Sequence, residues 1–590
     1  MKKRELKKSI RRTAAMLLST CILLTGCGST GGGGILTPPE PNTEKPAPTY
    51  TESEIEQRIA LAGASYDGLY RADADYIYYK GSQSRNLSMA PVMESEACDE
   101  VSGASNYSYS IPDGDWQQVE WNTENYNLVK ESGFLSVATS PFSTFGADVD
   151  TATYTNLRRK IFAETDNFGI SDDAIRVEEM INYFHYDYAA PKEGDKFGVT
   201  TALTNCPWNP DALLLRVGVK AEEIQPKGGS NIVFLIDTSG SMFDSNKLPL
   251  AQKAFSILAE NLNDEDTVSI VTYAGNSEVV LEGAKGSETT KIQNAVNALE
   301  AYGSTNGEGG IKKAYEIAEK YFIKGGNNRI ILATDGDLNV GVSSEADLIS
   351  LVEEKRETGV FLSCLGFGTG NYQDSKMEAL ADYGNGNYSY IDCTAEASRV
   401  LKDEMWSTLY TVAKDVKFQV EFNPEQVKGY RLIGYENRAM AAEDFANDKK
   451  DGGEVGSGQT VTVLYEIIPA DSGYAMPVVA SRYGNDVKVD TETTTLSDEL
   501  LAVNIRYKEP DASESKLLTY PVTKDMLQAE MDADTSFAAG VAEFGMLLRK
   551  SEYSGTASYQ EIYDRLKVLP GVMDDDFKAE FLYLVKKVSK

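Results

Sequence analysis

The region between residues 230 and 408 alternates short apolar segments with segments of helical periodicity. The apolar segments, which read as strands, cover residues 231–236, 267–273, 329–334, 360–366 and 387–391. After the first of them, apolar residues recur every three or four positions from Leu248 to Leu262, which predicts a helix with one apolar face. Strands that are apolar on both faces, separated by one-sided helices, are typical of a parallel sheet covered by helices on both sides. The sequence therefore predicts a doubly wound, mostly parallel α/β domain.

The segments before and after this region have the pattern of a β-rich domain. Residues 197–220 read as two strands joined by a turn, and after residue 410 apolar and polar residues alternate in three segments, as in half-buried strands. We expect these strands to pair in one β-sandwich, so that the α/β domain is inserted in it or flanked by it. Helices are predicted over residues 155–163 and 174–184, and in the tail from about residue 524 to 590.

The N-terminus carries the pattern of an export signal. Residues 2–12 contain seven basic residues and one acidic residue, a short apolar segment follows, and then comes Leu24-Thr25-Gly26-Cys27. The L-T-G-C ending resembles the lipobox of bacterial lipoproteins, and that resemblance implies cleavage before Cys27 and attachment of lipid to its thiol. The alternative is an ordinary secretory signal with a chance cysteine. We expect a protein on the extracytoplasmic face of the cell membrane, held there by a lipid anchor.

The charge and the cysteine content exclude several classes of protein. Acidic residues outnumber basic ones by 90 to 57, and the formal net charge of −33 excludes nucleic-acid binding, which needs clustered Lys and Arg. Four cysteines follow Cys27, too few for a disulfide framework in a chain of 590 residues. Cys364 and Cys393 lie in apolar segments and are expected to be buried thiols, while the sequence leaves any pairing with Cys98 or Cys206 open.

These patterns give the domain boundaries that the sequence predicts. They are a signal peptide (1–26), a Gly- and Pro-rich tether (27–50), a poorly structured Tyr-rich region (51–140), an N-terminal helical extension (141–195), β-strands (196–229), the α/β domain (230–408), and a C-terminal domain that is first β-rich and then helical (409–590). Within the Tyr-rich region, a short helix is predicted near residues 51–62.

Oxygen-bearing side chains follow directly on the first apolar strand of the α/β domain. Asp237, Ser239 and Ser241 are two residues apart, and such residues point the same way in an extended segment. Asp335 comes at the end of another strand, and Thr305 lies in a loop before a helix. Ligands of doubly wound sheets bind beyond the carboxyl ends of the strands, so we expect all of these side chains at one edge of the sheet.

The chemistry of this donor set indicates a metal. Two carboxylates and three hydroxyls are hard oxygen donors, which favour Mg²⁺ or Mn²⁺. Ca²⁺ fits less well because it usually takes six to eight oxygen ligands with more carboxylates. Two carboxylates only balance a divalent cation, so the metal would still accept a carboxylate from outside the chain.

These five residues, in this order, resemble the metal-ion-dependent adhesion site of von Willebrand factor type A domains. The resemblance implies that the hydroxyls of Ser239, Ser241 and Thr305 touch the metal, and that Asp237 and Asp335 act directly or through water. It also implies that the partner is a protein that supplies a Glu or Asp side chain to the metal.

The similarity extends beyond the α/β domain. The segments F-S-T-F-G-A-D-V-D-T-A-T-Y (142–154), A-I-R-V-E-E-M-I-N-Y-F (174–184), A-T-D-G-D-L-N-V-G (333–341) and L-G-F-G-T-G-N-Y-Q-D-S-K-M-E-A-L-A (365–381) are similar to those of a bacterial lipoprotein subfamily. Its members carry an N-terminal extension before the A domain and a C-terminal domain of unknown function after it. The match covers about residues 125–590.

Three other interpretations of these residues compete with metal-dependent adhesion. The side chains of the D-x-S-x-S segment could merely form a turn and a helix cap, but that leaves Thr305 and Asp335 at the same edge unexplained. A metal-dependent phosphohydrolase with an Asp nucleophile needs a general acid two residues later, and Ser239 cannot serve as one. A scaffold for envelope assembly, in which the metal is only structural, remains open. We therefore expect a binding protein that is not an enzyme.

Three further carboxylates lie near the five residues in the sequence or at another strand end. Glu308 and Asp337 either tune the charge of the site or are solvated loop residues. Asp374 follows another strand end and is a weaker candidate for the same rim.

Overall fold

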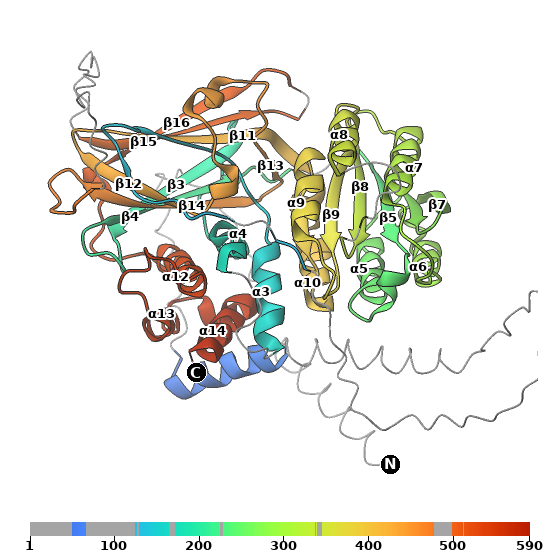
Figure 1. Cartoon of the computed structure of the whole chain (residues 1–590), viewed down its shortest axis with the longest axis horizontal. Helices are drawn as coiled ribbons and strands as arrows, with labels where there is room; N and C mark the ends of the chain where they lie inside the picture. The colour runs from blue at the N-terminus through green and yellow to red at the C-terminus, as the bar shows by residue number, and fades with distance from the viewer. Residues whose placement is uncertain are drawn as a thin grey trace, which may run out of the picture. The chain divides into compact units, whose positions relative to one another are not determined.

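The α/β domain is built on a six-stranded sheet in which β5 occupies an inner position between β8 and β6. Figure 1 shows β9, β8 and β5 side by side in this sheet. The strand order is β10-β9-β8-β5-β6-β7, and β5 runs parallel to both of its neighbours. The strands are β5 (Ser230–Asp237), β6 (Thr267–Tyr273), β7 (Ser277–Lys285), β8 (Asn327–Thr334), β9 (Phe361–Gly366) and β10 (Tyr388–Tyr390). Because β7 pairs antiparallel with β6, the sheet is mostly rather than wholly parallel.

The computed structural model describes most of the chain from Tyr50 onward. The described residues are 50–65, 124–126, 129–163, 172–224, 228–336, 338, 345–476, 498–510 and 512–589. The predicted signal peptide, residues 27–49 of the predicted tether with the expected lipidation site Cys27, and Cys98 lie outside them. Among the described helices, none combines the length and the apolar character that crossing a bilayer requires.

Helices cover both faces of the parallel sheet. The helical segments of the domain are α5 (Leu248–Ala259), α6 (Thr289–Asn297), α7 (Gly307–Lys320), α8 (Glu345–Arg356), α9 (Asp374–Tyr383), α10 (Thr394–Ser398), a π-helical turn (Arg399–Asp403) and α11 (Met405–Leu409). Ile232, Phe234 and Ile236 of β5 belong to the core cluster with α5, whereas Val233 and Leu235 belong to the cluster with α7 and α9. Both faces of β5 are therefore buried, which explains its unbroken apolar run.

Two further sheets form the sandwich from strands on both sides of the α/β domain. One has the order β1-β12-β14-β4-β3, and the other has the order β13-β11-β15-β16 with β2 paired to β11. The strands are β1 (Leu135–Ser136), β2 (Phe142–Gly146), β3 (Phe197–Asn205), β4 (Leu213–Ala221), β11 (Thr411–Phe422), β12 (Val427–Ile433), β13 (Gly453–Gly456), β14 (Thr460–Pro469), β15 (Glu499–Lys508) and β16 (Lys516–Thr523). Since β4 pairs with β14, the chain leaves this sheet, forms the α/β domain and returns. The predicted fold class is confirmed.

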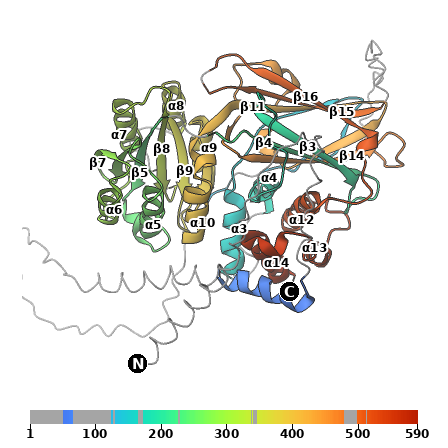
Figure 2. The ribbon, with the colours of Figure 1, turned by 180° about the vertical axis from the view of Figure 1, so that it is seen from behind.

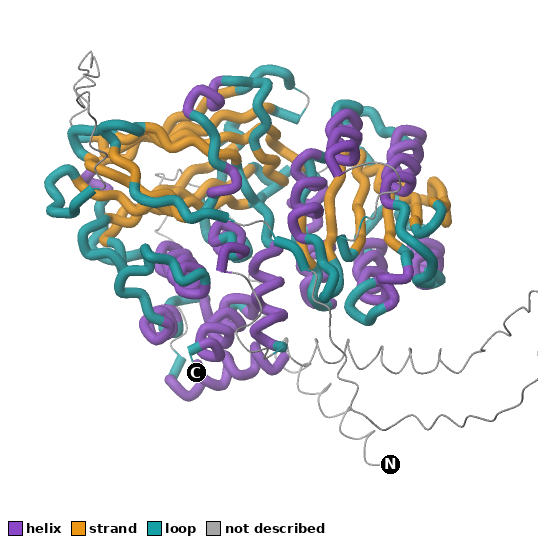
Figure 3. The backbone as a smooth tube through the Cα atoms, in the orientation of Figure 1, coloured by secondary structure: helices purple, strands orange, loops and turns teal. Residues whose placement is uncertain are grey.

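A helical layer completes the described part of the chain (Figures 2 and 3). It contains residues 52–65, α3 (Ala152–Phe162), α4 (Val177–Asn182), α12 (Ala533–Leu548), α13 (Tyr559–Leu566) and α14 (Asp576–Val588). Ile55 and Ile59 of the first helix are buried in the same core cluster as Phe581 and Val585 of α14. The helix predicted near residues 51–62 is thus present, in a region that was expected to be poorly structured.

The helix predicted over residues 174–184 is interrupted. A 3₁₀ turn covers Asp172–Ala174, and α4 begins only at Val177. Arg176 between them has an extended backbone, with φ −88° and ψ 106°. Its buried guanidinium donates to Asp374 at 2.8 Å and forms an ion pair with Glu179. The ion pairs of Arg176 fix a conformation that a continuous helix does not have.

Buried arginines join the helical layer to the α/β domain. The guanidinium of Arg158 on α3 lies 2.7 Å from Asp392, 2.9 Å from Glu396 and 3.3 Å from Glu580. Arg438, which is partly exposed and follows β12 of the sandwich, contacts Asp148 at 2.9 Å and, in the α/β domain, Asp382 at 2.6 Å. Removing one member of such a buried group leaves uncompensated charges in a medium of low polarity.

We therefore expect Arg158→Met to lower the free energy of unfolding by about 3–5 kcal/mol, because three carboxylates lose their shared cation. Equilibrium unfolding in urea measures this. Lys313→Met is the matched control, since Lys313 forms a half-exposed pair with Glu316 on one helix face and its loss should cost less than about 1 kcal/mol. Equal losses in the two variants would contradict the role given to Arg158.

Candidate metal centre

The first loop of the candidate site begins where β5 ends, at Asp237. This aspartate is fully buried, and its Oδ1 accepts a hydrogen bond of 2.9 Å from the backbone N–H of Ser239. The hydroxyl oxygens of Ser239 and Ser241 lie 3.0 Å apart. The turn after β5 therefore gathers three side-chain oxygen groups in one place, as the two-residue spacing predicted.

The second loop, which carries Thr305, is bonded to the first. The N–H of Tyr302 donates to the carbonyl of Thr238 at 2.8 Å, and the N–H of Gly240 donates to the carbonyl of Gly303 at 3.0 Å. A Cβ on Gly240 would lie 3.2 Å from the Gly303 oxygen, so a larger residue would push the two loops apart. Thr305 itself is half-buried and lies one residue before Asn306, the N-cap of α7.

Asp335 reaches the same edge from the end of β8. The neighbouring Thr334 donates its hydroxyl to Asp237 Oδ2 at 2.8 Å, which links the ends of β5 and β8. Asp335 is fully buried. Burial and then the nearby Asp335 carboxylate raise the pKa of Asp237 to about 6. The structure therefore brings the two predicted aspartates together, and their charges interact.

Sequence reasoning missed a lysine in this site. The Lys247 ammonium lies 3.0 Å from Asp335 Oδ2 and 2.7 Å from Asn371 Oδ1, and Asn371 in turn donates to Asp335 Oδ2 at 3.0 Å. The Lys247 side chain is only 4 % exposed. Nothing in the sequence distinguishes Lys247 from a solvated lysine before an amphipathic helix, because its partner is 88 residues away.

The three outlying carboxylates differ from the five site residues. Asp374 is fully buried and accepts from Arg176 at 2.8 Å and from the Tyr388 hydroxyl at 2.7 Å, so its weak assignment to the rim is wrong. Glu308 pairs with Lys312 one helical turn later. Asp337 lies outside the described residues. Cys206, Cys364 and Cys393 are free and buried, which confirms the expectation for the last two.

The donor set suits a small, hard cation. The described residues contain no cluster of three or more His, Cys, Asp and Glu side chains arranged to hold a metal. A cation at this edge would therefore depend on hydroxyl oxygens besides the two carboxylates. The adjacent Ser239 and Ser241 hydroxyls, close to the Asp237 carboxylate, provide such oxygens.

The raised pKa of Asp237 predicts that the free energy of unfolding of the metal-free protein falls as the pH rises. An aspartate ionises near pH 3.9 in the unfolded chain, and in the folded chain at about 6. Folding therefore loses stability as pH rises from about 4 through about 6 and stays at the lower value above that range. In EDTA, Asp237→Asn should raise the free energy of unfolding by about 2–3 kcal/mol at pH 8.

Urea unfolding at pH 4 to 8 measures this difference. The gain of Asp237→Asn over the parent should disappear toward pH 4, where the parent carboxyl is protonated in both states. Asp244→Asn, at an exposed aspartate just beyond the same turn, is the control and should stay close to the parent. A gain of Asp237→Asn that did not vary with pH would contradict the electrostatic explanation.

Comparison with known families covers most of the chain. Residues 231–403 match the family described as "von Willebrand factor type A domain", and residues 120–216 match one described as "von Willebrand factor". Residues 407–590 match "Uncharacterized protein YfbK, C-terminal".

Several curated proteins are similar to this chain. "Uncharacterized protein YfbK" of Escherichia coli (strain K12) is 41% identical over 475 residues, which are 79% of this chain and 81% of that protein. "Uncharacterized protein sll0103" of Synechocystis sp. is 28% identical over 194 residues, 32% of this chain and 44% of that protein. "Inter alpha-trypsin inhibitor, heavy chain 4" of Mus musculus is 25% identical over 222 residues, 36% of this chain and 23% of that protein.

Solved structures with a similar fold include two from microorganisms. "von Willebrand factor type A from Catenulispora acidiphila" has a TM-score of 0.36 and 15% identity, with 61% of this chain and 80% of that chain covered. The "ArnB paralog VWA2 from Sulfolobus acidocaldarius" has a TM-score of 0.33 and 19% identity, with 67% and 98% covered.

Proposed function

Because the chain belongs to the family of von Willebrand factor type A domain proteins that includes YfbK of Escherichia coli, we propose that it captures a protein partner through a bound divalent cation. Domains of this type commonly mediate protein–protein interaction. The proposed cation is Mg²⁺ or Mn²⁺, with Ca²⁺ the less suitable ion. Its proposed ligands, direct or through water, are Asp237, Ser239, Ser241, Thr305 and Asp335.

One observation carries this proposal. The Ser239 and Ser241 hydroxyls lie 3.0 Å apart next to the buried Asp237, at the carboxyl edge of a parallel sheet. Hydroxyl oxygens bring no charge, so two aspartates are the only formal negative charges among the five ligands. A bound cation keeps an affinity for an anionic oxygen, which a Glu or Asp of the partner would supply.

The net charge of the chain supports a role for the cation in this contact. At −33, the protein repels acidic partners at a distance. A divalent cation at the edge of the sheet neutralises the two aspartates and offers a coordination position, so an acidic side chain can bind there although the surface as a whole is negative. Capture of the partner should therefore depend on the metal.

We expect Asp237→Ala and Ser239→Ala to abolish the heat of Mg²⁺ or Mn²⁺ binding and the capture of the partner, while the circular dichroism spectrum stays that of the parent. Isothermal titration calorimetry measures the first effect, and a pull-down from envelope extract in Mg²⁺ against EDTA measures the second. Asp244→Ala, which removes an exposed carboxylate close to Ser241, is the matched control and should bind as the parent does.

Two outcomes separate this proposal from its alternatives. A partner captured equally well in Mg²⁺ and EDTA would favour a scaffold in which the metal is structural. Turnover of phosphoester substrates that is lost in Asp237→Ala would favour a phosphohydrolase, although Ser239 occupies the position that a general acid needs. We propose that the protein is not an enzyme.

We further propose that the protein is anchored on the extracytoplasmic face of the cell membrane by lipid on Cys27. The L-T-G-C sequence after a basic and apolar leader supports this. Cys27→Ser should move the protein from the membrane fraction to the soluble fraction, because the thiol that accepts the lipid is lost. Fractionation followed by immunoblotting measures this, with Cys21→Ser, in the apolar part of the leader, as the control. A membrane-bound Cys27→Ser protein would contradict lipid anchoring.

A further inference from the structure

A short segment that precedes α3, residues 124–126, is bonded to a loop at the candidate metal centre. We call residues 124–126 the strap and residues 368–373, which directly precede α9, the rim loop. The N–H of Asn125 donates to the carbonyl of Tyr372, and the N–H of Asp374 donates to the carbonyl of Asn125, both at 3.0 Å. Asn125 thus pairs with Gln373 as in a parallel strand pair. Glu124 lies 246 residues before Gly370 in the sequence. The sandwich strands β3 and β4 come between the strap and the rim loop in the sequence.

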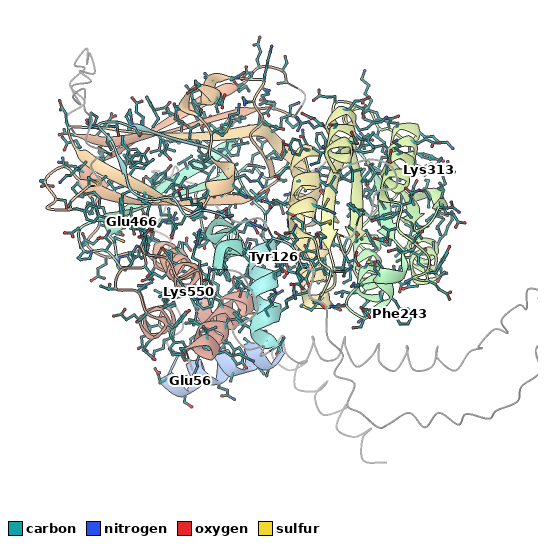
Figure 4. All side chains as sticks on the ribbon, viewed as in Figure 1. Glu56, Tyr126, Phe243, Lys313, Glu466 and Lys550 are labelled. Carbon is teal, nitrogen blue, oxygen red and sulfur yellow. The ribbon has the colours of Figure 1, made fainter. Side chains whose placement is uncertain are left out.

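Glu124 ties the rim loop to α3 as well. Its Oε1 accepts from the N–H of Gly370 at 3.0 Å, and its carboxylate lies 3.0 Å from Arg159 and 2.9 Å from Lys160. Burial opposes its ionisation, but Arg159 and Lys160 lower the pKa of Glu124 to about 2, so it is charged at neutral pH. Tyr126, labelled in Figure 4 beside α3, donates its hydroxyl to the same carboxylate at 3.0 Å.

The other side of the rim loop holds Lys247. The Asn371 side chain accepts from the Lys247 ammonium at 2.7 Å and donates to Asp335 at 3.0 Å. The stem of Lys247 runs over Gly368, where a Cβ would lie 2.5 Å from the lysine Cγ and Cε. The rim loop therefore fixes both the stem and the head of Lys247, and directs the ammonium onto Asp335.

We propose that the strap sets the cation affinity of the site by holding Lys247 on Asp335 through the rim loop. This inference rests on the proposed metal binding. With Lys247 in place, two carboxylates and one ammonium give the site a formal charge of −1, and a bound divalent cation brings it to +1. The ammonium weakens cation binding by repulsion and leaves the loaded site with a net positive charge that favours an acidic ligand.

The backbone position of Asp335 does not depend on the strap, although its carboxylate also accepts from Asn371 of the rim loop. Asp335 follows β8, which is hydrogen-bonded between β5 and β9, and the N–H of the next residue, Gly336, donates to the Thr334 hydroxyl at 3.1 Å. Lys247, in contrast, directly precedes α5, and its side chain packs against the rim loop before its ammonium donates to Asp335. Releasing the strap should therefore free the ammonium while the ligand carboxylate stays in place. Glu124 is a positioning residue in this scheme.

The test is Mn²⁺ titration by calorimetry on the full chain in detergent. Glu124→Gln should bind Mn²⁺ about three- to tenfold more tightly than the parent, and Lys247→Met about tenfold or more. The double variant Glu124→Gln/Lys247→Met should match Lys247→Met alone, because the strap acts through the lysine. Asn371→Ala, at the other end of the same contacts, should resemble Glu124→Gln and replaces it if that variant does not fold.

The matched control is Glu131→Gln. Glu131 also belongs to the segment before α3 and pairs with a buried arginine, Arg431, at 3.2 Å, but it lies in the sandwich. Its loss should leave the Mn²⁺ affinity within twofold of the parent. A readout without metal is hydrogen exchange in EDTA: the amides of Gly370 and Asp374 should exchange at least tenfold faster in Glu124→Gln and unchanged in Glu131→Gln.

Each result bears on the inference. A folded Glu124→Gln protein with unchanged or weaker Mn²⁺ binding overturns it, as do additive effects in the double variant. If the amides of Gly370 and Asp374 exchange in Glu124→Gln at the same rate as in the parent, that result alone overturns the role of the strap. If the parent binds no Mn²⁺, both the proposed function and the inference are overturned. If the parent binds Mn²⁺ and Glu124→Gln binds it with the same affinity, only the inference is overturned.

Discussion

The burial of β5 on both faces is the constraint on which the candidate metal centre depends. The strand lies between β8 and β6, in parallel register with both. The carboxyl ends of these three strands therefore meet at one edge, and the chain must leave the sheet there. Asp237, the last residue of β5, is held fully buried at that point, and the loop that carries Thr305 is tied to the turn after it. The topology of the sheet therefore suffices to bring oxygen-bearing side chains together at this edge.

A second constraint is the set of buried ion pairs that joins the α/β domain to the rest of the described chain. Arg158 and Arg438 connect α3 and the sandwich to carboxylates of the domain. Glu124 pairs with Arg159 and Lys160 of α3 and contacts the domain by accepting a hydrogen bond from the N–H of Gly370. Buried pairs add little net stability compared with apolar contacts, but they tolerate only one arrangement of partners. They therefore favour one orientation of the α/β domain relative to the sandwich and the helical layer. The rim loop of the candidate site lies where these parts contact one another.

Strands and helices whose apolar residues follow a regular pattern could be predicted from the sequence. Contacts between charged residues that are far apart in the sequence could not. The strand at residues 231–236 was recognised because both of its faces are apolar, whereas the edge strand β7 alternates half-buried and exposed residues and was not assigned. The five oxygen donors could be proposed because each lies close to a predicted strand end or helix start. Lys247 and Glu124 could not be found, since their partners are 88 and 246 residues away and a single charged residue shows no period.

The missed residues change what the predicted ones can do. Two aspartates alone would neutralise a divalent cation, and the loaded site would attract an acidic side chain only through the open coordination position. Lys247 adds a positive charge 3.0 Å from one of those aspartates. In a chain of net charge −33, that local positive charge would favour the acidic partner that we propose. Because the strap contacts the rim loop and the rim loop contacts this ammonium, the segment before α3 would contribute to the proposed recognition, although none of its residues is among the proposed ligands.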